Sequence, residues 1–421
     1  MTDRNRADDK TILVIGTYDT KSEELTYLAS RIEAEGGTVM AMDVSVLGEP
    51  ASPVEISKHD VAEAGGSSIE AAIATGLENE AMQIMARGAS AMAAKLHREG
   101  RIHGMIALGG TMGTDLALDV ANTLPMGVPK YVVSTVAFSP LIPTERLAPD
   151  LQMILWAGGL YGLNSVCKSS LSQAAGAVLG AARAVEPPQR DRPIIGMTSL
   201  GSSCLSYMVK LKPELEKRGF ELAVFHATGM GGRAFEALAA EGAFACVMDF
   251  AMSEFGNLIH GTVVNSGESR LTNAGRAGVP QIVAPGCVDL ADVAAWQPVA
   301  TKWSDREMYP HNRLLGCITL TGEERGETAR QIADRLSKAK GPTYFILPNK
   351  GVEEWDREGG EAHDPEALDA FMSAARTNIL PNVPSVEIDA HINDQAFVDK
   401  VLEIFDGWIA DGTVKTGSRA G

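Results

Sequence analysis

A glycine-rich turn in the first half of the chain has the residue types needed to bind a phosphate. It follows an apolar run at residues 106–108 and contains Gly109, Gly110, Thr111, Gly113 and Thr114. An apolar strand that leads through such a turn into a helix brings backbone N–H groups to the helix N-terminus, where the peptide dipoles also favour an anion. Tight turns alone often need glycine, but the two hydroxyl side chains favour the phosphate interpretation.

A second turn of this kind follows the apolar run at residues 12–15 and contains Gly16, Thr17, Asp19 and Lys21. A cation in the first turn of a helix opposes the helix dipole unless an anion lies nearby, so Lys21 indicates a bound phosphate. The stretch is not a P-loop, because Thr20 stands where that motif has a glycine. Asp19 could hold a magnesium ion, since hard cations prefer carboxylate oxygen. The alternative is a capping box formed by Thr20 and Glu23.

Three further polar residues follow predicted strands of the first half. Asp43 ends the second strand, where an acidic residue commonly contacts ribose hydroxyls, although it is also an ordinary turn residue. Ser134 and Thr135 end the fourth strand and would add hydroxyl groups to the same sheet edge, or would simply cap a turn. These residues extend the predicted nucleotide site.

The second half has its own glycine-rich turn between a strand and a helix, with Gly229, Gly231, Gly232 and Arg233. Backbone N–H groups in such a turn form a nest for a carboxylate or a phosphate, and an arginine can pair with the same anion. The pattern therefore predicts a second anion site.

Other polar side chains of the second half could supply acids, bases and a cation for catalysis. The candidates are His226, Asp249, Glu254, Arg270, Asp289 and His391. Each alone is more often structural than catalytic, and only a shared position near strand ends favours a catalytic role. The histidines show no His-Glu-x-x-His pair and the cysteines no Cys-x-x-Cys pair, so no zinc site is predicted.

Composition restricts the possible partners. The 421 residues include 37 basic and 54 acidic side chains, which gives a net charge of −17. This charge opposes binding to nucleic acid and to anionic membranes. No apolar run approaches the roughly 20 residues that span a bilayer, and the 5 cysteines are odd in number and widely spaced. We therefore expect a soluble cytoplasmic protein with reduced thiols.

Strand-like apolar runs alternate with helical patterns along the whole chain, which predicts an α/β fold with parallel sheets covered by helices on both faces. The paired prolines within residues 187–192 suit an exposed linker. We therefore expect two successive Rossmann-like, doubly wound parallel-sheet domains, at residues 1–186 and 193–421, with a ligand cleft between them. Residues 285–315 show little periodicity, and a loop of this length predicts a lid or an interface arm.

Several of these motifs together resemble the Tm-one-like ATP-binding domain family of bacteria, fungi and plants. The matching stretches are residues 16–21, 108–114, 134–137, 225–234 and 391–394. The resemblance implies two Rossmann-like subdomains, a homodimer, and ATP with magnesium on the first subdomain. It also implies nucleotide contacts from Lys21, Gly109, Gly110, Thr111 and Gly113, with Arg87 as a further candidate. The chain departs from the plant relatives at Thr111-Met112, where the family often has small residues.

Two functional hypotheses remain open from the sequence. The first is an ATP- and magnesium-binding protein of metabolic role, with the nucleotide at the strand ends of the N-terminal domain. The second is an enzyme that acts on a small phosphorylated or carboxylated metabolite in the interdomain cleft. A density of polar groups beyond what ATP requires favours the enzyme, whereas the lack of a known catalytic motif opposes it.

Overall fold

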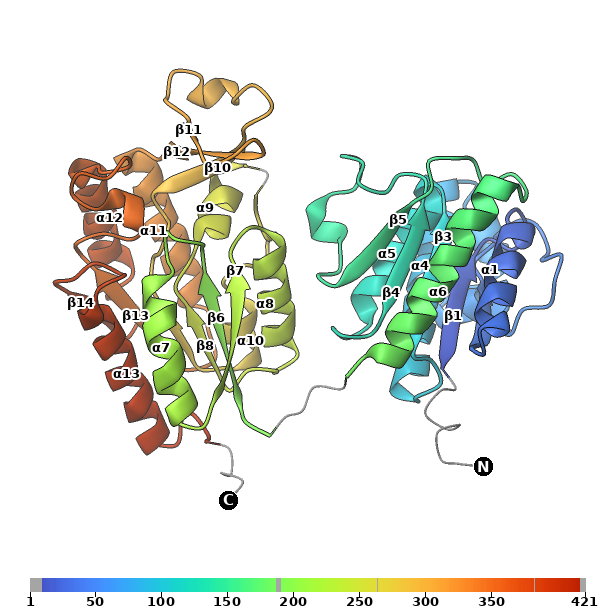
Figure 1. The fold of residues 1–421 in the computed structure, drawn as a ribbon, viewed down its shortest axis with the longest axis horizontal. Helices are drawn as coiled ribbons and strands as arrows, with labels where there is room; N and C mark the ends of the chain where they lie inside the picture. The colour runs from blue at the N-terminus through green and yellow to red at the C-terminus, as the bar shows by residue number, and fades with distance from the viewer. Residues whose placement is uncertain (1–9, 187–190, 263, 382, 417–421) are drawn as a thin grey trace. The chain divides into compact units, whose positions relative to one another are not determined.

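A computed structural model describes residues 10–186, 191–262, 264–381 and 383–416. The chain divides into two compact units, Met1–Pro187 (unit 1) and Pro188–Gly421 (unit 2), each with its own sheet (Figure 1). The predicted linker spans 187–192, and of it residues 187–190 lie outside the described part. The predicted fold class is confirmed, because each unit has a parallel sheet flanked by helices.

Unit 1 is built on a parallel sheet with the strand order β2-β1-β3-β4-β5. Its strands are β1 (Thr11–Gly16), β2 (Thr38–Asp43), β3 (Gly104–Gly109), β4 (Lys130–Ser134) and β5 (Leu151–Leu155). Its helices are α1 (Ser22–Ala34), α2 (Lys58–Ala64), α3 (Ile69–Ala74), α4 (Glu78–Arg98), α5 (Thr111–Thr123) and α6 (Ser165–Ala184), with the 3-10 turn η2 (Thr144–Arg146).

Alternating side chains of β1 reach both faces of this sheet, as the strand period requires. Ile12 and Val14 pack with α1 and α6, whereas Leu13 and Ile15 pack with α4 and α5. The helix that follows β1 therefore covers one face, and the helix that follows β3 covers the other. The order β2-β1-β3 thus contains a topological switch point between β1 and β3.

Unit 2 has a parallel sheet with the order β14-β13-β9-β8-β6-β7. Its strands are β6 (Ile194–Ser199), β7 (Glu221–His226), β8 (Cys246–Asp249), β9 (Gln281–Val283), β13 (Thr343–Pro348) and β14 (Ser385–Ile388). Its helices are α7 (Ser206–Lys217), α8 (Met230–Ala240), α9 (Ser253–His260), α10 (Asn273–Ala277), α11 (Gly322–Leu336), α12 (Pro365–Asn378) and α13 (Gln395–Ala410). The order of its first strands repeats that of unit 1, with a switch point between β6 and β8.

A small antiparallel sheet interrupts the parallel pattern of unit 2. It consists of β10 (Leu290–Ala294), β11 (Tyr309–Pro310) and β12 (Leu315–Thr319), and we call residues 290–319 the roof. Figure 1 shows it in yellow and orange at one end of the unit. β12 pairs antiparallel with β10, so this segment is not part of the parallel sheet.

The roof has its own apolar cluster, in which Trp303 of the 3-10 turn η3 (Thr301–Trp303) packs against β10 and β12. A second 3-10 turn, η4 (Glu354–Asp356), follows β13. Within the described residues, no helix has both the length and the apolar composition to cross a bilayer.

Candidate functional site

The switch point of unit 1 brings the two predicted phosphate turns to the same edge of the sheet. β1 and β3 are adjacent parallel strands, so the turns that follow them are neighbours. Ligands of open α/β sheets bind outside the carboxyl ends of the strands at such a position. The register also aligns Gly109 with Ser134 of β4 and Gly16 with Asp43 of β2, which places all four strand ends at one edge.

The turn after β1 surrounds a lysine with hydroxyl groups. The Thr17 and Thr20 hydroxyl oxygens lie 2.9 Å apart, and the Lys21 Nζ lies 3.5 Å from the first and 3.4 Å from the second. Lys21 is the N-cap of α1, and no side chain caps that helix end. In the part of unit 1 that the structure describes, no carboxylate forms an ion pair with Lys21.

The capping-box alternative does not form in this turn. The helix begins at Ser22, which places Thr20 outside it, and the Thr20 hydroxyl bonds to Thr17 instead. The Glu23 carboxylate accepts the backbone N–H of Leu163 at 3.3 Å. A capping box therefore does not explain the residue types of this turn.

The turn after β3 contains glycines with two different roles. A Cβ on Gly109 would lie 2.6 Å from the Cα of Gly113, so Gly109 is needed for close contact between strand and helix, whereas a Cβ on Gly113 would lie 3.4 Å from the Leu108 carbonyl oxygen. A Cβ on Gly110 would meet only the Thr135 hydroxyl oxygen, at 3.7 Å. Gly110 is the N-cap of α5, and no side chain caps this helix either. The exposed Thr111 follows it.

Two predicted site hydroxyls have a structural role. The Thr114 and Ser134 hydroxyl oxygens lie 2.6 Å apart in the interior, and Ser134 also accepts the Val136 backbone N–H at 3.0 Å. These bonds join α5 to the end of β4. Thr135, one residue later, is only partly buried and lies near Gly110.

The two acidic residues of the predicted site differ in burial, since Asp43 is fully buried and Asp19 is only partly buried. Asp43 is fully buried, and its Oδ1 accepts the backbone N–H of Tyr18 at 3.2 Å and of Ser45 at 2.9 Å. It therefore holds the turn after β1, and burial separates it from a ribose. Asp19 accepts the Gly48 N–H on Oδ2, and its buried Oδ1 has no hydrogen-bond partner among the described residues. Asp43 likewise keeps one buried carboxylate oxygen, Oδ2, without a hydrogen-bond partner among the described residues.

Arg87 lies in the middle of α4. Its side chain is exposed, one residue before Gly88, which packs against the Val61 carbonyl of α2. A contact of Arg87 with a nucleotide stays a prediction.

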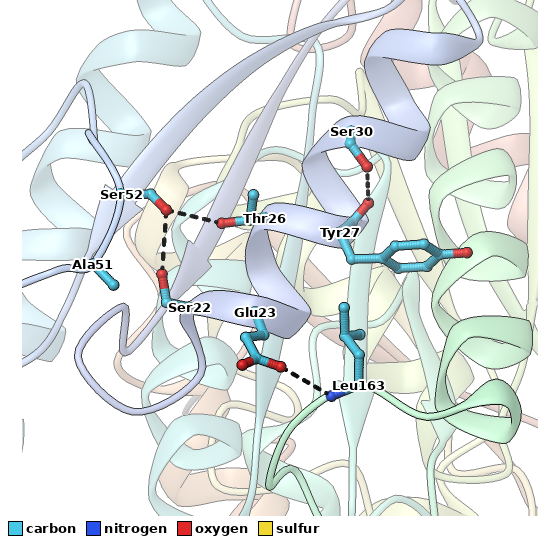
Figure 2. A pocket seen from close by; sticks show the side chains of 8 residues that line it. All are labelled: Ser22, Glu23, Thr26, Tyr27, Ser30, Ala51, Ser52 and Leu163. Atoms are coloured by element: carbon cyan, nitrogen blue, oxygen red, sulfur yellow. Dashed lines mark hydrogen bonds between the residues drawn. The ribbon is translucent and has the colours of Figure 1, made fainter.

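A hollow of about 420 Å³ lies beside the first turns of α1 (Figure 2). Figure 2 shows its hydroxyl groups bonded to one another, with Ser52 Oγ 3.5 Å from Ser22 Oγ and 3.3 Å from Thr26 Oγ1. Glu23 is its charged lining residue. A carboxylate repels phosphate, so this hollow does not extend the predicted phosphate site.

In unit 2, four of the charged side chains form a buried ionic cluster. Arg270 is fully buried and bonds to both carboxylate oxygens of Asp249. Its Nε donates to Glu254 at 3.1 Å, and its Nη1 lies 3.5 Å from Glu236. Burial raises the pKa of Glu254, and it raises the pKa of Glu236 to about 7 against the opposing effect of Arg270. The cluster occupies the switch point of unit 2, because Asp249 also accepts the Thr198 hydroxyl of β6 at 2.7 Å.

The predicted second anion site already holds an anion of the chain itself. The Glu254 carboxylate accepts the backbone N–H of Gly229 and, at 2.9 Å, that of Gly232. A Cβ on Gly232 would overlap this carboxylate, and a Cβ on Gly231 would overlap the His226 carbonyl oxygen. The Glu254 carboxylate thus occupies the Gly229 and Gly232 amides, which are not available to an external anion. The nearby Arg233 is partly buried on α8.

A second buried group contains Asp289 and His391. The His391 Nε2 lies 2.8 Å from the Glu353 carbonyl oxygen and 3.1 Å from Asp356 Oδ1, and its Nδ1 accepts the Asn393 N–H at 3.1 Å. These contacts assign the proton to Nε2. Burial raises the pKa of Asp289 to about 7 and that of Glu353 to about 9.

The six catalytic candidates therefore fall into three sets. Asp249, Glu254 and Arg270 belong to the ionic cluster, and Asp289 and His391 belong to the second buried group. His226 is exposed at the end of β7, with Nδ1 3.2 Å from the Thr228 hydroxyl oxygen. The sequence analysis missed Glu236, Glu353 and Asp356, and no spacing signal distinguishes them from ordinary surface acids.

The fold and the strand-end turns define a class: a protein of two Rossmann-like units in series, with a topological switch point in each. The model for the N-terminal domain of the family described as "Uncharacterised protein family (UPF0261)" matches residues 10–187, and the model for its C-terminal domain matches residues 192–409. The chain belongs to the UPF0261 family.

Relatives of this family match nearly the whole chain. A UPF0261 protein of Brucella melitensis is 54% identical over 409 residues, which cover 97% of this chain and 98% of the relative. A UPF0261 protein of Clostridium tetani is 35% identical over 391 residues, which cover 92% of this chain and 96% of the relative.

A plant protein is a more distant relative. The ToMV susceptible protein tm-1(GCR26) of Solanum lycopersicum is 26% identical over 422 residues, which cover 94% of this chain and 55% of the tomato protein. Among solved structures, the Streptomyces glycosyltransferase SsfS6 in complex with thymidine diphosphate is 13% identical, with coverage of 94% of this chain and 99% of that one. Its TM-score of 0.17 carries no argument about function.

Proposed function

We propose that unit 1 binds ATP with magnesium at the switch point between β1 and β3. One observation carries the proposal: α1 and α5, on opposite faces of the sheet, both begin at this point without a side-chain cap. Their first N–H groups are therefore left to a ligand or to water. Together with the positive ends of two helix dipoles, these amides form a site for a polyanion.

Each residue of the site has a distinct task in this proposal. The amides that follow Gly110 hold the phosphates, and the ammonium group of Lys21 neutralises their charge. The Thr135 hydroxyl, close to Gly110, donates to the same anion. The unpartnered Oδ1 of Asp19 fits a magnesium ion that takes its other ligands from phosphate oxygens and water, as magnesium commonly does. The resemblance to an ATP-binding family favours ATP among phosphorylated ligands.

The test is a titration of the full chain with magnesium and ATP, followed by hydrogen exchange and mass spectrometry. We expect amides at residues 16–22 and 109–114 to become protected in the wild type. At ten times the dissociation constant, the ligand stabilises the bound unit by about 1.4 kcal/mol. Lys21→Ala removes a charge-assisted contact and should weaken binding by about tenfold or more.

Two further variants make the result specific. Gly110→Val places a side chain over the open face of the turn and should abolish protection there. Lys95→Ala removes an exposed lysine from the last turn of α4 and serves as the charge-matched control. Equal protection in all variants, or protection that lies only outside the two turns, would refute the proposed site.

A further inference from the structure

A pocket of about 90 Å³, partly open to solvent, lies in unit 2 between the roof and the carboxyl ends of the parallel strands. The liquid volume of one water molecule is about 30 Å³, so the cavity holds a compound of a few non-hydrogen atoms. On the parallel-sheet side its lining residues include Ser202, Ser203, His226, Thr228, Cys287 and Trp355. The roof contributes Leu290, Asp292, His311, Leu315 and Cys317. Small ligands of α/β sheets bind at this edge.

The roof is tied to the body of unit 2 on several sides. Asn257 of α9 donates to Asp292 Oδ2 at 2.6 Å and accepts the Asp292 backbone N–H at 2.8 Å. The Trp303 indole donates to Glu324 of α11 at 3.3 Å. Hydrogen bonds at both sides hold the roof in place, so the cavity is a built feature of the fold.

The polar groups around the cavity match a ligand that both donates and accepts hydrogen bonds. His226 and Thr228 lie together at the end of β7, and Ser202 is exposed in the turn after β6. Imidazole and hydroxyl groups each donate and accept, which is also the property of ligand hydroxyl groups. The His311 ring of the roof lies 6.3 Å from the Trp355 ring, centroid to centroid, and these rings give the cavity an apolar surface for C–H groups.

The charges around the cavity disfavour an anionic ligand. Its lining residues include no lysine and no arginine. Its carboxylate, Asp292, is already bonded to Asn257 and accepts the Cys317 thiol at 3.4 Å. Burial raises the pKa of the Cys317 thiol, and the hydrogen bond with Cys204 raises that of Cys287, so both thiols stay neutral. An anion would meet a carboxylate without a compensating cation.

We propose that this cavity binds a small neutral polyhydroxylated compound, such as a short polyol. The site is separate from the proposed nucleotide site and does not depend on it. Hydroxyl groups of the ligand bond to Thr228, His226 and the serines, and its carbon chain lies against Trp355 and His311. This chemistry differs from the phosphorylated or carboxylated metabolite that the sequence suggested.

The experiment uses the full chain without nucleotide, so that its result is independent of ATP binding. Glycerol and erythritol are the neutral probes, and glycerate and glycerol 3-phosphate are anionic probes of similar size. Saturation-transfer NMR reports which probe contacts the protein, and a titration gives its dissociation constant. We expect transfer to a neutral probe and weaker or no transfer to the anionic ones.

Paired threonine variants locate the binding. Thr228→Val removes a cavity hydroxyl with little change in volume and should weaken binding of the neutral probe about two- to tenfold. Thr377→Val makes the same change on the exposed face of α12, outside the cavity, and should have no effect. The proposal is overturned if neither neutral probe shows transfer, if the two variants behave alike, or if an anionic probe binds more tightly than the neutral ones.

Discussion

The two units share the order of their first strands, yet their switch points contain opposite arrangements of charge. In unit 1, the turns beside the switch point leave α1 and α5 uncapped and present the Lys21 ammonium group among hydroxyls. In unit 2, the same position is filled by the Thr198 hydroxyl, Asp249 and the buried Arg270. One unit keeps its polar groups for a ligand or water, and the other uses them within the protein.

This difference shows that glycine-rich strand exits alone do not identify a phosphate site. Gly231 and Gly232 are required by the His226 carbonyl oxygen and the Glu254 carboxylate, both within the chain. Gly110 meets no such constraint. A structural turn therefore differs from a binding turn because groups of the chain itself already fill the space that a ligand would occupy.

The largest expected effect is on the ionic cluster of unit 2. Arg270→Met leaves the carboxylates of Asp249, Glu254 and Glu236 buried without their cation, and breaking a buried ion pair costs about 3–5 kcal/mol. We expect the free energy of unfolding of unit 2 to fall by about this amount in urea titrations. Arg276→Met, which removes an exposed arginine of α10, is the control and should change the free energy of unfolding by less than about 0.5 kcal/mol. A small effect of both substitutions would show that the cluster is not needed for stability.

The second test compares glycines at the two switch points. Gly231→Ala forces a Cβ against the His226 carbonyl oxygen and should destabilise unit 2 by about 1–3 kcal/mol, as overpacking does. Gly110→Ala has room for its Cβ and a negative φ of −76°, so it should change the stability of unit 1 by less than about 0.5 kcal/mol. Thermal unfolding of both variants measures the difference. Equal losses would contradict the distinction between a filled turn and an open one.

The sequence predicted the fold class and the strand exits, because hydrophobic alternation and turn residues are local signals. It did not predict which side chains bond to the turns after those strands, since Glu254 reaches the Gly229 and Gly232 amides only through the tertiary fold. The same limitation applies to Asp43, which looked available at a strand end and is buried beneath the turn after β1. The predicted contacts of Lys21 and Gly110 with a nucleotide stay predictions.

The roof shows a different limitation of the sequence pattern. Residues 285–315 lack a clear period because β10, β11 and the turn η3 are short, and the two strands pair antiparallel with β12 within a parallel domain. The lid or interface arm expected here stays a prediction, and hydrogen bonds from Asn257 and to Glu324 tie the segment to the rest of unit 2. Apolar periodicity contains no information about such long-range pairs.

The buried acids of unit 2 should make its stability depend on pH. Glu353 is fully buried, and its pKa is raised to about 9 by burial and by Asp289. Because the folded state holds a proton that the unfolded state releases above about pH 4.5, this group reduces stability as pH rises from there towards 9. Glu353→Gln mimics the protonated form. The free energy of unfolding of the variant minus that of the wild type should therefore increase by at least about 1 kcal/mol between pH 5.5 and pH 8.

Urea titrations of unit 2 at the two pH values measure this difference. Glu358→Gln removes an exposed carboxylate of the same segment and should give a pH profile parallel to that of the wild type. A parallel profile for Glu353→Gln as well would mean that Glu353 is ionised in the folded protein.

The smallest expected effect concerns Lys21, whose charge opposes the dipole of α1 when no anion is bound. Lys21→Met removes this opposition and should stabilise ligand-free unit 1 by about 0.3–1 kcal/mol at low ionic strength. The gain should shrink as salt screens the charge, whereas Lys21→Arg keeps the charge and should leave stability unchanged. Hydrogen exchange of the α1 amides measures these differences. If Lys21→Met destabilises unit 1, groups of the chain already satisfy the cation, and the switch point of unit 1 is filled internally as in unit 2.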